Sequence, residues 1–199
     1  MLHVISVIQS KGGTGKTTTS MFLAAAMRER GFKVAVLDTD PQQSATRWSN
    51  AATPPLPFPV VSAASARELN DGLRRAAKAD FILIDTPPGD SDIIDAAISV
   101  ASLILVPTGV SPMEMDRTQV TLDALAKTNV PAAVVLVNVD RREKLADIVH
   151  AELAGDETMA LADVVIPTRA STRRAFGTTP HLYEAWKALA EELCSAFEE

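Results

Sequence analysis

The chain has 199 residues and a mass of 21.2 kDa, and 47% of its residues are hydrophobic, so it can bury a sizeable core in one domain. Nineteen basic against 25 acidic residues give a net charge of −6, which argues against a surface that attracts nucleic acid everywhere. The single cysteine, Cys194, excludes an intrachain disulfide and a cysteine-based metal site within one chain. Because no secretory signal and no apolar run of membrane-spanning length is evident, we expect a single cytoplasmic domain over residues 1–199.

Short apolar runs of strand length alternate with helical patterns along the chain. The expected strands are Leu2–Gln9, Lys33–Asp38, Phe58–Val61, Phe81–Asp85, Leu103–Pro107 and Ala132–Val139. The expected helices are Lys16–Arg30, Ala66–Lys78, Ile93–Ala101, Met115–Thr128, Arg142–Leu153 and His181–Phe197. This alternation predicts an α/β fold with a mostly parallel twisted sheet and helices on both faces, and the last helix is expected to pack on the sheet.

A glycine-rich segment with the sequence KGGTGKTT lies between the first expected strand and the first expected helix. Its glycines allow successive backbone N–H groups to wrap an anion, and the helix N-terminus adds unpaired donors. Lys16 would reach the β- and γ-phosphates, and the Thr17 hydroxyl would ligate Mg²⁺. The residues expected to bind the nucleotide here are Lys11, Gly12, Gly13, Thr14, Gly15, Lys16, Thr17 and Thr18.

The segment departs in one place from the general phosphate-loop pattern G-x-x-x-x-G-K-[ST]. Ser10 stands where the pattern has its first glycine. A glycine-rich turn with exposed lysines is the alternative interpretation. The element order and the acidic residues described below favour a P-loop NTPase fold instead.

Lys11, five residues before Lys16, makes the segment resemble the deviant Walker A motif K-G-G-x-G-K-[ST] of the ParA/MinD family. That resemblance implies an ATPase that uses ATP, ADP and Mg²⁺ and forms a homodimer in the ATP state. It further implies that Lys11 reaches across the dimer interface to the partner's nucleotide, and that Lys11 and Lys16 act in catalysis.

Asp38 and Asp40 end the second expected strand, where carboxylates face the ligand crevice of a doubly wound sheet. The string D-T-D-P-Q resembles the second signature of the family. By that resemblance Asp40 positions or activates the attacking water, as a catalytic residue, and Asp38 supports the Mg²⁺ shell. An ordinary turn opened by Asp before Pro is the alternative for Asp40.

Asp85 ends an apolar strand, as in a Walker B motif, and is expected to hold Mg²⁺ through a water molecule. Pro88 and Gly89 follow it. A backbone N–H in this segment can contact a γ-phosphate and lose it after hydrolysis, so we expect residues 86–92 to form a switch.

The adenine site is expected by family resemblance near Asn138 and Pro167. An Asn amide can pair with a base edge and a Pro ring can cover its face, although both residue types are also common in ordinary loops.

Arg169, Arg173 and Arg174 lie in a stretch of the chain, residues 167–180, that contains no acidic residue. The following residues, 181–199, carry one lysine and five glutamates, and this acidic end disfavours a MinD-like membrane helix. ParA proteins hold DNA nonspecifically through basic residues, so we expect these arginines to bind DNA phosphates. Solvated arginines or surface ion pairs are the alternative.

The leading hypothesis is a ParA-type partition ATPase of the small plasmid type, because the phosphate loop begins at residue 11 and leaves no room for an N-terminal helix-turn-helix. Such a protein is nucleoid-associated, and a ParB- or ParG-like centromere-binding or cargo adaptor stimulates its ATP hydrolysis. Positioning of protein cargo, such as chemoreceptor arrays or microcompartments, remains an alternative, as does a dethiobiotin-synthetase-like metabolic ligase. The lone cysteine disfavours a nitrogenase-iron-protein relative, whose cluster needs two cysteines per subunit.

Overall fold

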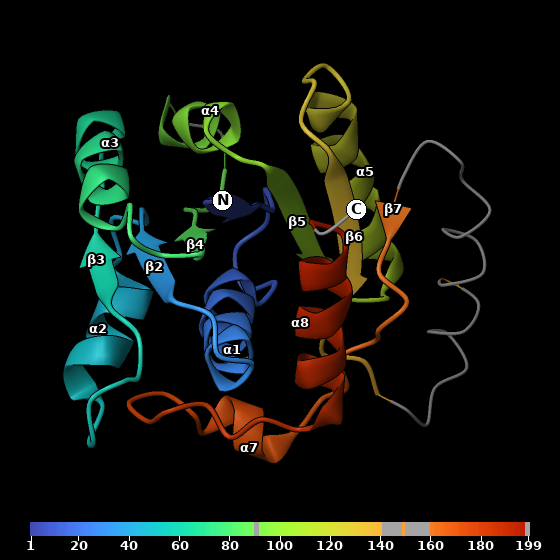
Figure 1. Cartoon of the computed structure of the whole chain (residues 1–199). Coiled ribbons are helices and arrows are strands. Elements are labelled where there is room, and N and C mark those ends of the chain that lie inside the picture. Colours follow the sequence, from blue (N-terminus) through green and yellow to red (C-terminus); the bar gives the residue numbers. More distant parts are fainter. Residues whose placement is uncertain (90–91, 141–148, 150–159, 198–199) are drawn as a thin grey trace.

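The computed structural model describes residues 1–89, 92–140, 149 and 160–197. Within these ranges the chain forms a layered α/β structure with helices on both sides of one sheet (Figure 1). The expected helix Arg142–Leu153 lies outside the described residues, apart from Val149.

The described strands form one sheet in the order β3-β2-β4-β1-β5-β6-β7, and every strand pairing is parallel. This order confirms the α/β fold with a parallel sheet. The strand bounds are β1 (His3–Val7), β2 (Val34–Asp38), β3 (Val60–Ser62), β4 (Phe81–Asp85), β5 (Leu103–Thr108), β6 (Ala132–Leu136) and β7 (Ala160–Leu161).

The helices form two layers, one on each face of the sheet. Their bounds are α1 (Lys16–Glu29), α2 (Ser44–Ala51), α3 (Ala66–Arg75), α4 (Asp92–Ser99), α5 (Pro112–Leu125), α7 (Ala170–Arg173) and α8 (Glu184–Ser195). Apolar side chains of α1, α2 and α8 share one core cluster, whereas those of α3, α4 and α5 fall into two clusters that include the opposite strand faces.

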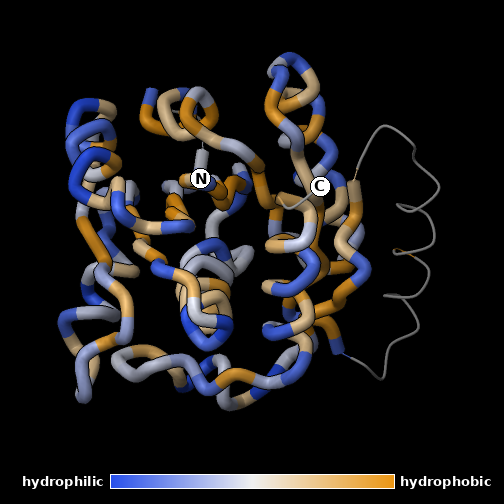
Figure 2. The backbone as a smooth tube through the Cα atoms, in the orientation of Figure 1, coloured by the Kyte–Doolittle hydropathy of each residue, from blue (hydrophilic) through white to orange (hydrophobic). Residues whose placement is uncertain are grey.

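The middle strands are apolar on both faces because each face is covered by helices. In β4, Phe81 and Leu83 join the cluster of α1 and α8, while Ile82 and Ile84 join the cluster of α3 and α4. Figure 2 shows this as orange tube in the central strands and more blue tube in the outer helices. A continuous apolar run in the sequence is therefore the expected signature of these strands.

The last helix packs back on the sheet, as expected. Trp186 of α8 is 1% exposed, and its ring centroid lies 5.0 Å from that of Phe22 in α1. Leu189 and Leu193 extend the same contact face along α8. This helix completes the layer that covers α1 and the sheet face beneath it.

Two element boundaries differ from the sequence-based expectation for identifiable reasons. The strand expected to begin at Phe58 begins at Val60, because Pro59 has no N–H to donate to a ladder, although its carbonyl accepts a hydrogen bond from Val36. Helix α5 begins at Pro112 instead of Met115, because a capping box between Ser111 and Glu114 precedes the apolar pattern.

Three short elements, α2, β7 and α7, were not expected from the sequence. Helix α2 has eight residues of which only Ala45 and Trp48 are buried, so its periodic signal is weak. Strand β7 and helix α7 have two and four residues. Elements this short are decided by tertiary contacts more than by local pattern.

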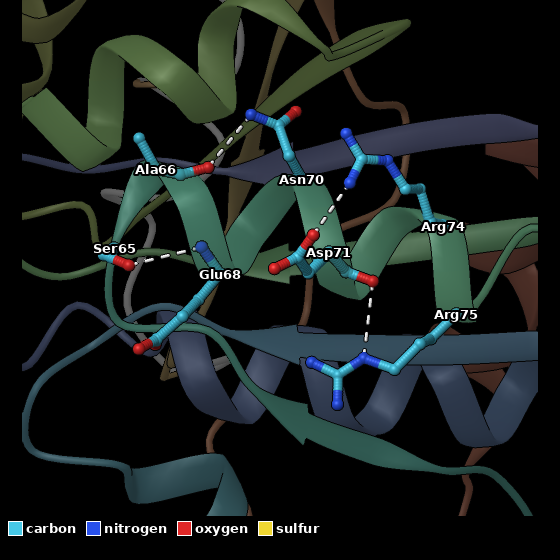
Figure 3. Close-up of polar contacts among 7 residues, drawn as sticks. All are labelled: Ser65, Ala66, Glu68, Asn70, Asp71, Arg74 and Arg75. Carbon is cyan, nitrogen blue, oxygen red and sulfur yellow. Dashed lines mark hydrogen bonds and ion pairs between the residues drawn. The ribbon is translucent and has the colours of Figure 1, made fainter.

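Helix α3 shows how local side chains set an element's start (Figure 3). The Ser65 hydroxyl accepts a hydrogen bond from the backbone N–H of Glu68 at 3.2 Å, which satisfies a donor of the first turn. On the exposed face Arg74 pairs with Asp71 at 2.8 Å, and Asn70 donates to the carbonyl of Ala66. The cap is the contact in this group that stabilises the helix most, since exposed ion pairs contribute little.

The Ser65→Ala variant is expected to lower the free energy of unfolding by about 1 kcal/mol, because it leaves the first turn of α3 uncapped. The midpoint of urea unfolding measures the loss. Asn70→Ala, which removes a polar side chain from the exposed middle of the same helix, serves as the matched control and should leave the midpoint within experimental error or raise it slightly. Equal losses in the two variants would show that the cap is not the stabilising contact.

Candidate functional site

The phosphate loop joins β1 to α1 and opens toward solvent. Gly13 and Gly15 have φ angles of 78° and 91°, which side chains rarely adopt, and Gly15 is the residue that precedes the first turn of α1. Gly12 and Gly13 are exposed, and Thr14 is buried. The loop therefore presents backbone and a helix N-terminus to a ligand, as an anion site requires.

Lys16 starts α1 and is only 7% exposed. Its Nζ donates to the backbone carbonyls of Gln9 at 3.1 Å and Lys11 at 3.2 Å. Burial lowers the pKa of Lys16, and the nearby Asp85 and Asp40 carboxylates oppose that shift. The loop thus holds its cation through its own main chain, inside the space where phosphate would bind.

Asp85 lies at the carboxyl end of β4, in register with Val7 of β1 and Asp38 of β2. It is fully buried, and neither carboxylate oxygen has a hydrogen-bond partner. Burial raises the pKa of Asp85 to about 7, and the Thr17 hydroxyl, which faces the carboxylate without reaching hydrogen-bond geometry, shifts the pKa the other way. Buried polar atoms are normally hydrogen-bonded, so two unpaired carboxylate oxygens at this position indicate a binding site for a ligand or metal.

The orphaned Asp85 carboxylate beside the Thr17 hydroxyl fits a Mg²⁺ site of the P-loop type, in which oxygen ligands, waters and nucleotide phosphates share the ion. The described residues contain no cluster of three acidic, histidine or cysteine side chains that could hold a metal by themselves. Nucleotide and metal would therefore bind together. Asp85 and Thr17 would hold the metal's ligand shell, and a bound Mg²⁺ would neutralise phosphate charge.

Asp38 is buried beside Asp85 but already has protein partners. One oxygen accepts from the backbone N–H and the hydroxyl of Thr46, both at 2.7 Å, and the other from the N–H of Asp40 at 3.3 Å. Burial raises the pKa of Asp38 while the Thr46 hydrogen bonds lower it. These contacts anchor the first turn of α2 on β2, a role that sequence reasoning missed, and the role of Asp38 in the Mg²⁺ shell stays a prediction.

A cavity of about 550 Å³ lies over the phosphate loop. Asp40 borders it, and its Oδ1 accepts from the backbone N–H of Gln42 at 2.8 Å, which closes the turn after β2. The lining residues are Gly12, Gly13, Gly15, Lys16, Thr17, Thr18, Asp40, Ser44, Arg47, Trp48, Pro88, Thr172, Arg173 and Phe176. The structure thus brings the predicted loop, Asp40 and the predicted switch into one cavity.

Two aromatic residues in the cavity wall were missed by sequence reasoning. Trp48 of α2 donates from Nε1 to the carbonyl of Thr178 at 2.8 Å, and its ring lies 5.9 Å from that of Phe176, which is 55% exposed. These contacts join α2 to the segment after α7 across the N-terminal end of α1. The tryptophan that follows the D-T-D-P-Q string was the available signal, since a lone Trp in a polar segment marks a packing site.

The predicted switch residues lie against the phosphate loop. Pro88 lines the cavity, and the backbone N–H of Gly89 donates to the carbonyl of Ser10 at 2.9 Å. Gly89 has a φ of 92°. This N–H could contact a γ-phosphate only if its hydrogen bond to the Ser10 carbonyl were broken. The switch function of this segment stays a prediction.

Of the two residues predicted near the base, Asn138 lies beside the phosphate loop, whereas the described contacts of Pro167 are with Val139 and Tyr183. The Asn138 amide nitrogen lies 3.6 Å from the position that a Cβ on Gly15 would occupy, and Asn138 is exposed. Pro167 pairs with Val139 in an isolated parallel bridge and is buried, with its carbonyl accepting from the Tyr183 hydroxyl at 3.2 Å. The assignment of Asn138 and Pro167 to the adenine site stays a prediction.

The three arginines predicted to bind DNA do not share one environment. The guanidinium of Arg169 lies 4.5 Å from the ring centroid of Tyr183, which is a cation–π contact. All three arginines are exposed, but Arg173 also lines the phosphate cavity, whereas Arg174 is not among the described residues that line it. The three arginines therefore share solvent exposure and differ in what they contact: Tyr183 for Arg169 and the cavity for Arg173.

The family model of the CobQ/CobB/MinD/ParA nucleotide binding domain matches residues 5–179. The chain belongs to this family. Membership makes it a P-loop ATPase domain of the ParA/MinD type and confirms the resemblance carried by Lys11 and its motif. Similar structures were solved with Mg-ADP, with ADP and magnesium, and with AMPPNP, which is consistent with ATP or ADP and Mg²⁺ as the ligands of this site.

The maintenance of carboxysome distribution protein A of Gloeobacter kilaueensis is 32% identical over 155 residues, which cover 75% of this chain and 69% of that protein. The chain spans about half the length of three further relatives, protein ParA of Rhizobium radiobacter and protein virC1 of Rhizobium rhizogenes and of Rhizobium radiobacter. MinD of Pyrococcus horikoshii, solved with Mg-ADP, matches with a TM-score of 0.78 at 21% identity, covering 100% of this chain and 99% of that one. The structure of pNOB8 ParA bound to nonspecific DNA matches with a TM-score of 0.67 at 17% identity. The match covers 100% of this chain and 99% of that one.

The Asp85→Asn variant is expected to raise the free energy of unfolding of the nucleotide-free protein by about 2 kcal/mol at pH 8 and to lose Mg²⁺-dependent ATP hydrolysis. The pKa of Asp85 is higher in the folded state than in the unfolded chain, so wild-type stability is expected to fall as pH rises from about 4 to about 7. The advantage of Asn should grow over the same interval.

Urea unfolding at pH 5 and pH 8 measures this difference, with Asp95→Asn, an exposed carboxylate on α4, as the control. A stability gain for Asp85→Asn that is the same at both pH values would contradict the assigned burial of a charge.

Proposed function

We propose that this ParA/MinD-type ATPase forms an ATP-dependent sandwich dimer as a single domain over residues 1–199, binds DNA nonspecifically, and is released when a partner stimulates hydrolysis. The observation that carries the proposal is the placement of the two motif lysines. Lys16 is buried in the cavity, whereas Lys11 is half-buried and is not among the described residues that line it. A second lysine that does not line its own phosphate cavity would be available to a nucleotide held by another subunit.

The open loop face supports dimerisation on the nucleotide. Gly12 and Gly13 are exposed, so the outer side of the phosphate loop has no cover from the described part of its own chain. ATP bound in the cavity would present its γ-phosphate on this face, and Lys11 of a second copy would neutralise charge that develops during phosphoryl transfer. Dimer formation would then depend on the triphosphate, and Asp40 at the cavity border would orient the attacking water.

Basic residues adjacent to the nucleotide site support DNA binding. Arg173 lies at the cavity, and both Arg173 and Arg174 are exposed, so a dimer organised by nucleotide would bring two such segments into one assembly. Doubling the number of neutralised phosphates strengthens binding steeply. The solved ParA complex with nonspecific DNA, which shares this fold, is consistent with the proposal. The protein would then be nucleoid-associated and would segregate plasmid or chromosomal DNA through a ParB- or ParG-like adaptor.

A second candidate function is the positioning of a protein cargo by the same cycle. The observation that favours it is the 32% identity to a carboxysome distribution protein over 75% of this chain. Both functions use ATP, a dimer and DNA and differ in the adaptor, so a pull-down with candidate adaptors in ATP would distinguish them.

Membrane attachment has less support than DNA binding. No helix among the described residues is long and apolar enough to cross a membrane. Helix α8 carries Glu184, Glu191 and Glu192 against the single basic residue Lys187, the reverse of the charge that meets anionic lipid. We therefore propose a cytoplasmic protein without stable membrane association.

Binding to a random-sequence DNA duplex is expected only with ATP or a nonhydrolysable analogue, and not with ADP, because only the triphosphate forms the dimer. Fluorescence anisotropy at two salt concentrations measures the affinity, and light scattering measures dimerisation in parallel. Lys16→Ala, the control, should abolish both by removing phosphate binding. Dimerisation without DNA binding would contradict the DNA step, and ATP turnover by a monomer would favour a metabolic ligase.

The arginines are expected to separate into two classes. Arg174→Ala should weaken DNA binding several-fold and lower the salt slope without changing nucleotide affinity, because one phosphate contact per subunit is lost. Arg173→Ala should also weaken nucleotide binding, because Arg173 lines the cavity. Nucleotide titration and the anisotropy assay measure the two effects. Identical behaviour of the two variants would contradict the division.

A further inference from the structure

A buried polar cluster connects the start of the phosphate loop to helix α5. Gln9 is 1% exposed, and its side-chain oxygen accepts from the Ser10 backbone N–H at 2.9 Å and from the Thr121 hydroxyl at 2.8 Å. Its amide nitrogen donates to the Thr118 hydroxyl at 3.1 Å. Both ends of the Gln9 amide are therefore fixed by residues outside the loop.

Two threonines on one face of α5 provide this attachment. Thr118 is fully buried and its Oγ1 lies 2.7 Å from that of Thr108, which ties the cluster to β5. Thr121 also lies 3.1 Å from the Ser10 hydroxyl. Buried hydroxyls in a helix often bond only to a backbone carbonyl one turn earlier. Here they also contact the loop that binds phosphate.

The same dipeptide, Gln9–Ser10, bonds to two groups that we expect to contact the γ-phosphate of bound ATP. The Gln9 carbonyl accepts from the Lys16 ammonium at 3.1 Å, and the Ser10 carbonyl accepts from the Gly89 N–H at 2.9 Å. The side chains of this dipeptide thus bond to α5, while its carbonyls bond to the lysine and to the switch glycine. A shift of α5 would move both carbonyls together.

We propose that Gln9 is a positioning residue for ATP hydrolysis, held by Thr118 and Thr121 of α5, and that α5 thereby sets the position of Lys16 relative to Gly89. This role explains why Ser10 replaces the first glycine of the general pattern: the residue needs no positive φ and its hydroxyl joins the cluster. The inference rests on ATP hydrolysis at this site and does not depend on DNA binding. Any event that displaces α5 would then alter the rate of hydrolysis.

The Thr121→Val variant tests the proposal, because it removes one hydroxyl with little change of shape. Losing one buried hydrogen bond is expected to lower kcat about fivefold to tenfold, with KM within about twofold, because the loop N–H groups that bind ground-state ATP are untouched. Gln9→Met should have the same effect through the other partner. Thr121→Ser, which keeps the hydroxyl, should restore the wild-type rate.

The matched control is Thr128→Val, which removes a hydroxyl just beyond the end of α5 that contacts the Leu125 carbonyl and not the loop. A second readout uses the nucleotide-free protein. Amide hydrogen exchange at Gly89, followed by NMR, should accelerate several-fold in Thr121→Val and stay unchanged in Thr128→Val, because the Ser10 carbonyl that protects this amide is no longer held.

The outcomes separate this proposal from the proposed function. Lower kcat with retained KM, rescue by Thr121→Ser and faster Gly89 exchange would support it. Unchanged Gly89 exchange and unchanged kcat in Thr121→Val, or equal losses in Thr128→Val, would overturn it and leave a purely structural cluster. If the wild-type chain fails to hydrolyse ATP, the proposed function fails, and the exchange measurement still decides whether α5 holds the switch glycine.

Discussion

The site depends on one electrostatic constraint. Lys16 and Asp85 are buried and attract each other, but they form no direct ion pair. Lys16 and Asp85 each affect the pKa of the other, yet the lysine is bound by loop carbonyls and the carboxylate has no hydrogen-bond partner. Such a separated pair is unfavourable unless a charged ligand enters between its members. Different elements hold the two groups, because Lys16 begins α1 and Asp85 ends β4.

Functional residues that lie close together in one short sequence motif could be predicted from the sequence. The phosphate loop and the acid after an apolar strand depend on local backbone geometry and on the rule that strand ends share one edge of a sheet. Helix α2 could not be predicted in this way, because a buried carboxylate of β2 and a tryptophan bound to a distant carbonyl anchor it. The spacing of hydrophobic residues predicts the middle of a helix or strand, but it does not predict long-range hydrogen bonds such as those that hold α2.

The polar residues of α5 illustrate the same limit. Thr118 and Thr121 recur at a spacing of three, which resembles a half-polar helix face in the sequence. In the structure they face inward and bond to Gln9. Nothing in their spacing distinguishes a buried polar contact from a solvated one, since the partner lies more than 100 residues earlier. For the same reason, the sequence could not predict that Arg169 contacts Tyr183 and that Arg173 lines the cavity.

The placement of the two tryptophans has an optical consequence. Trp186 is enclosed in the core between α8 and α1, far in sequence from the phosphate loop, whereas Trp48 borders the phosphate cavity. The Trp48 indole of α2 donates a hydrogen bond to the carbonyl of Thr178, 130 residues away. If nucleotide binding alters this hydrogen bond, the fluorescence emission of Trp48 is expected to change. The chain therefore contains one tryptophan fluorophore at its ligand site and a second in the core, and both rings contact Phe22 of α1.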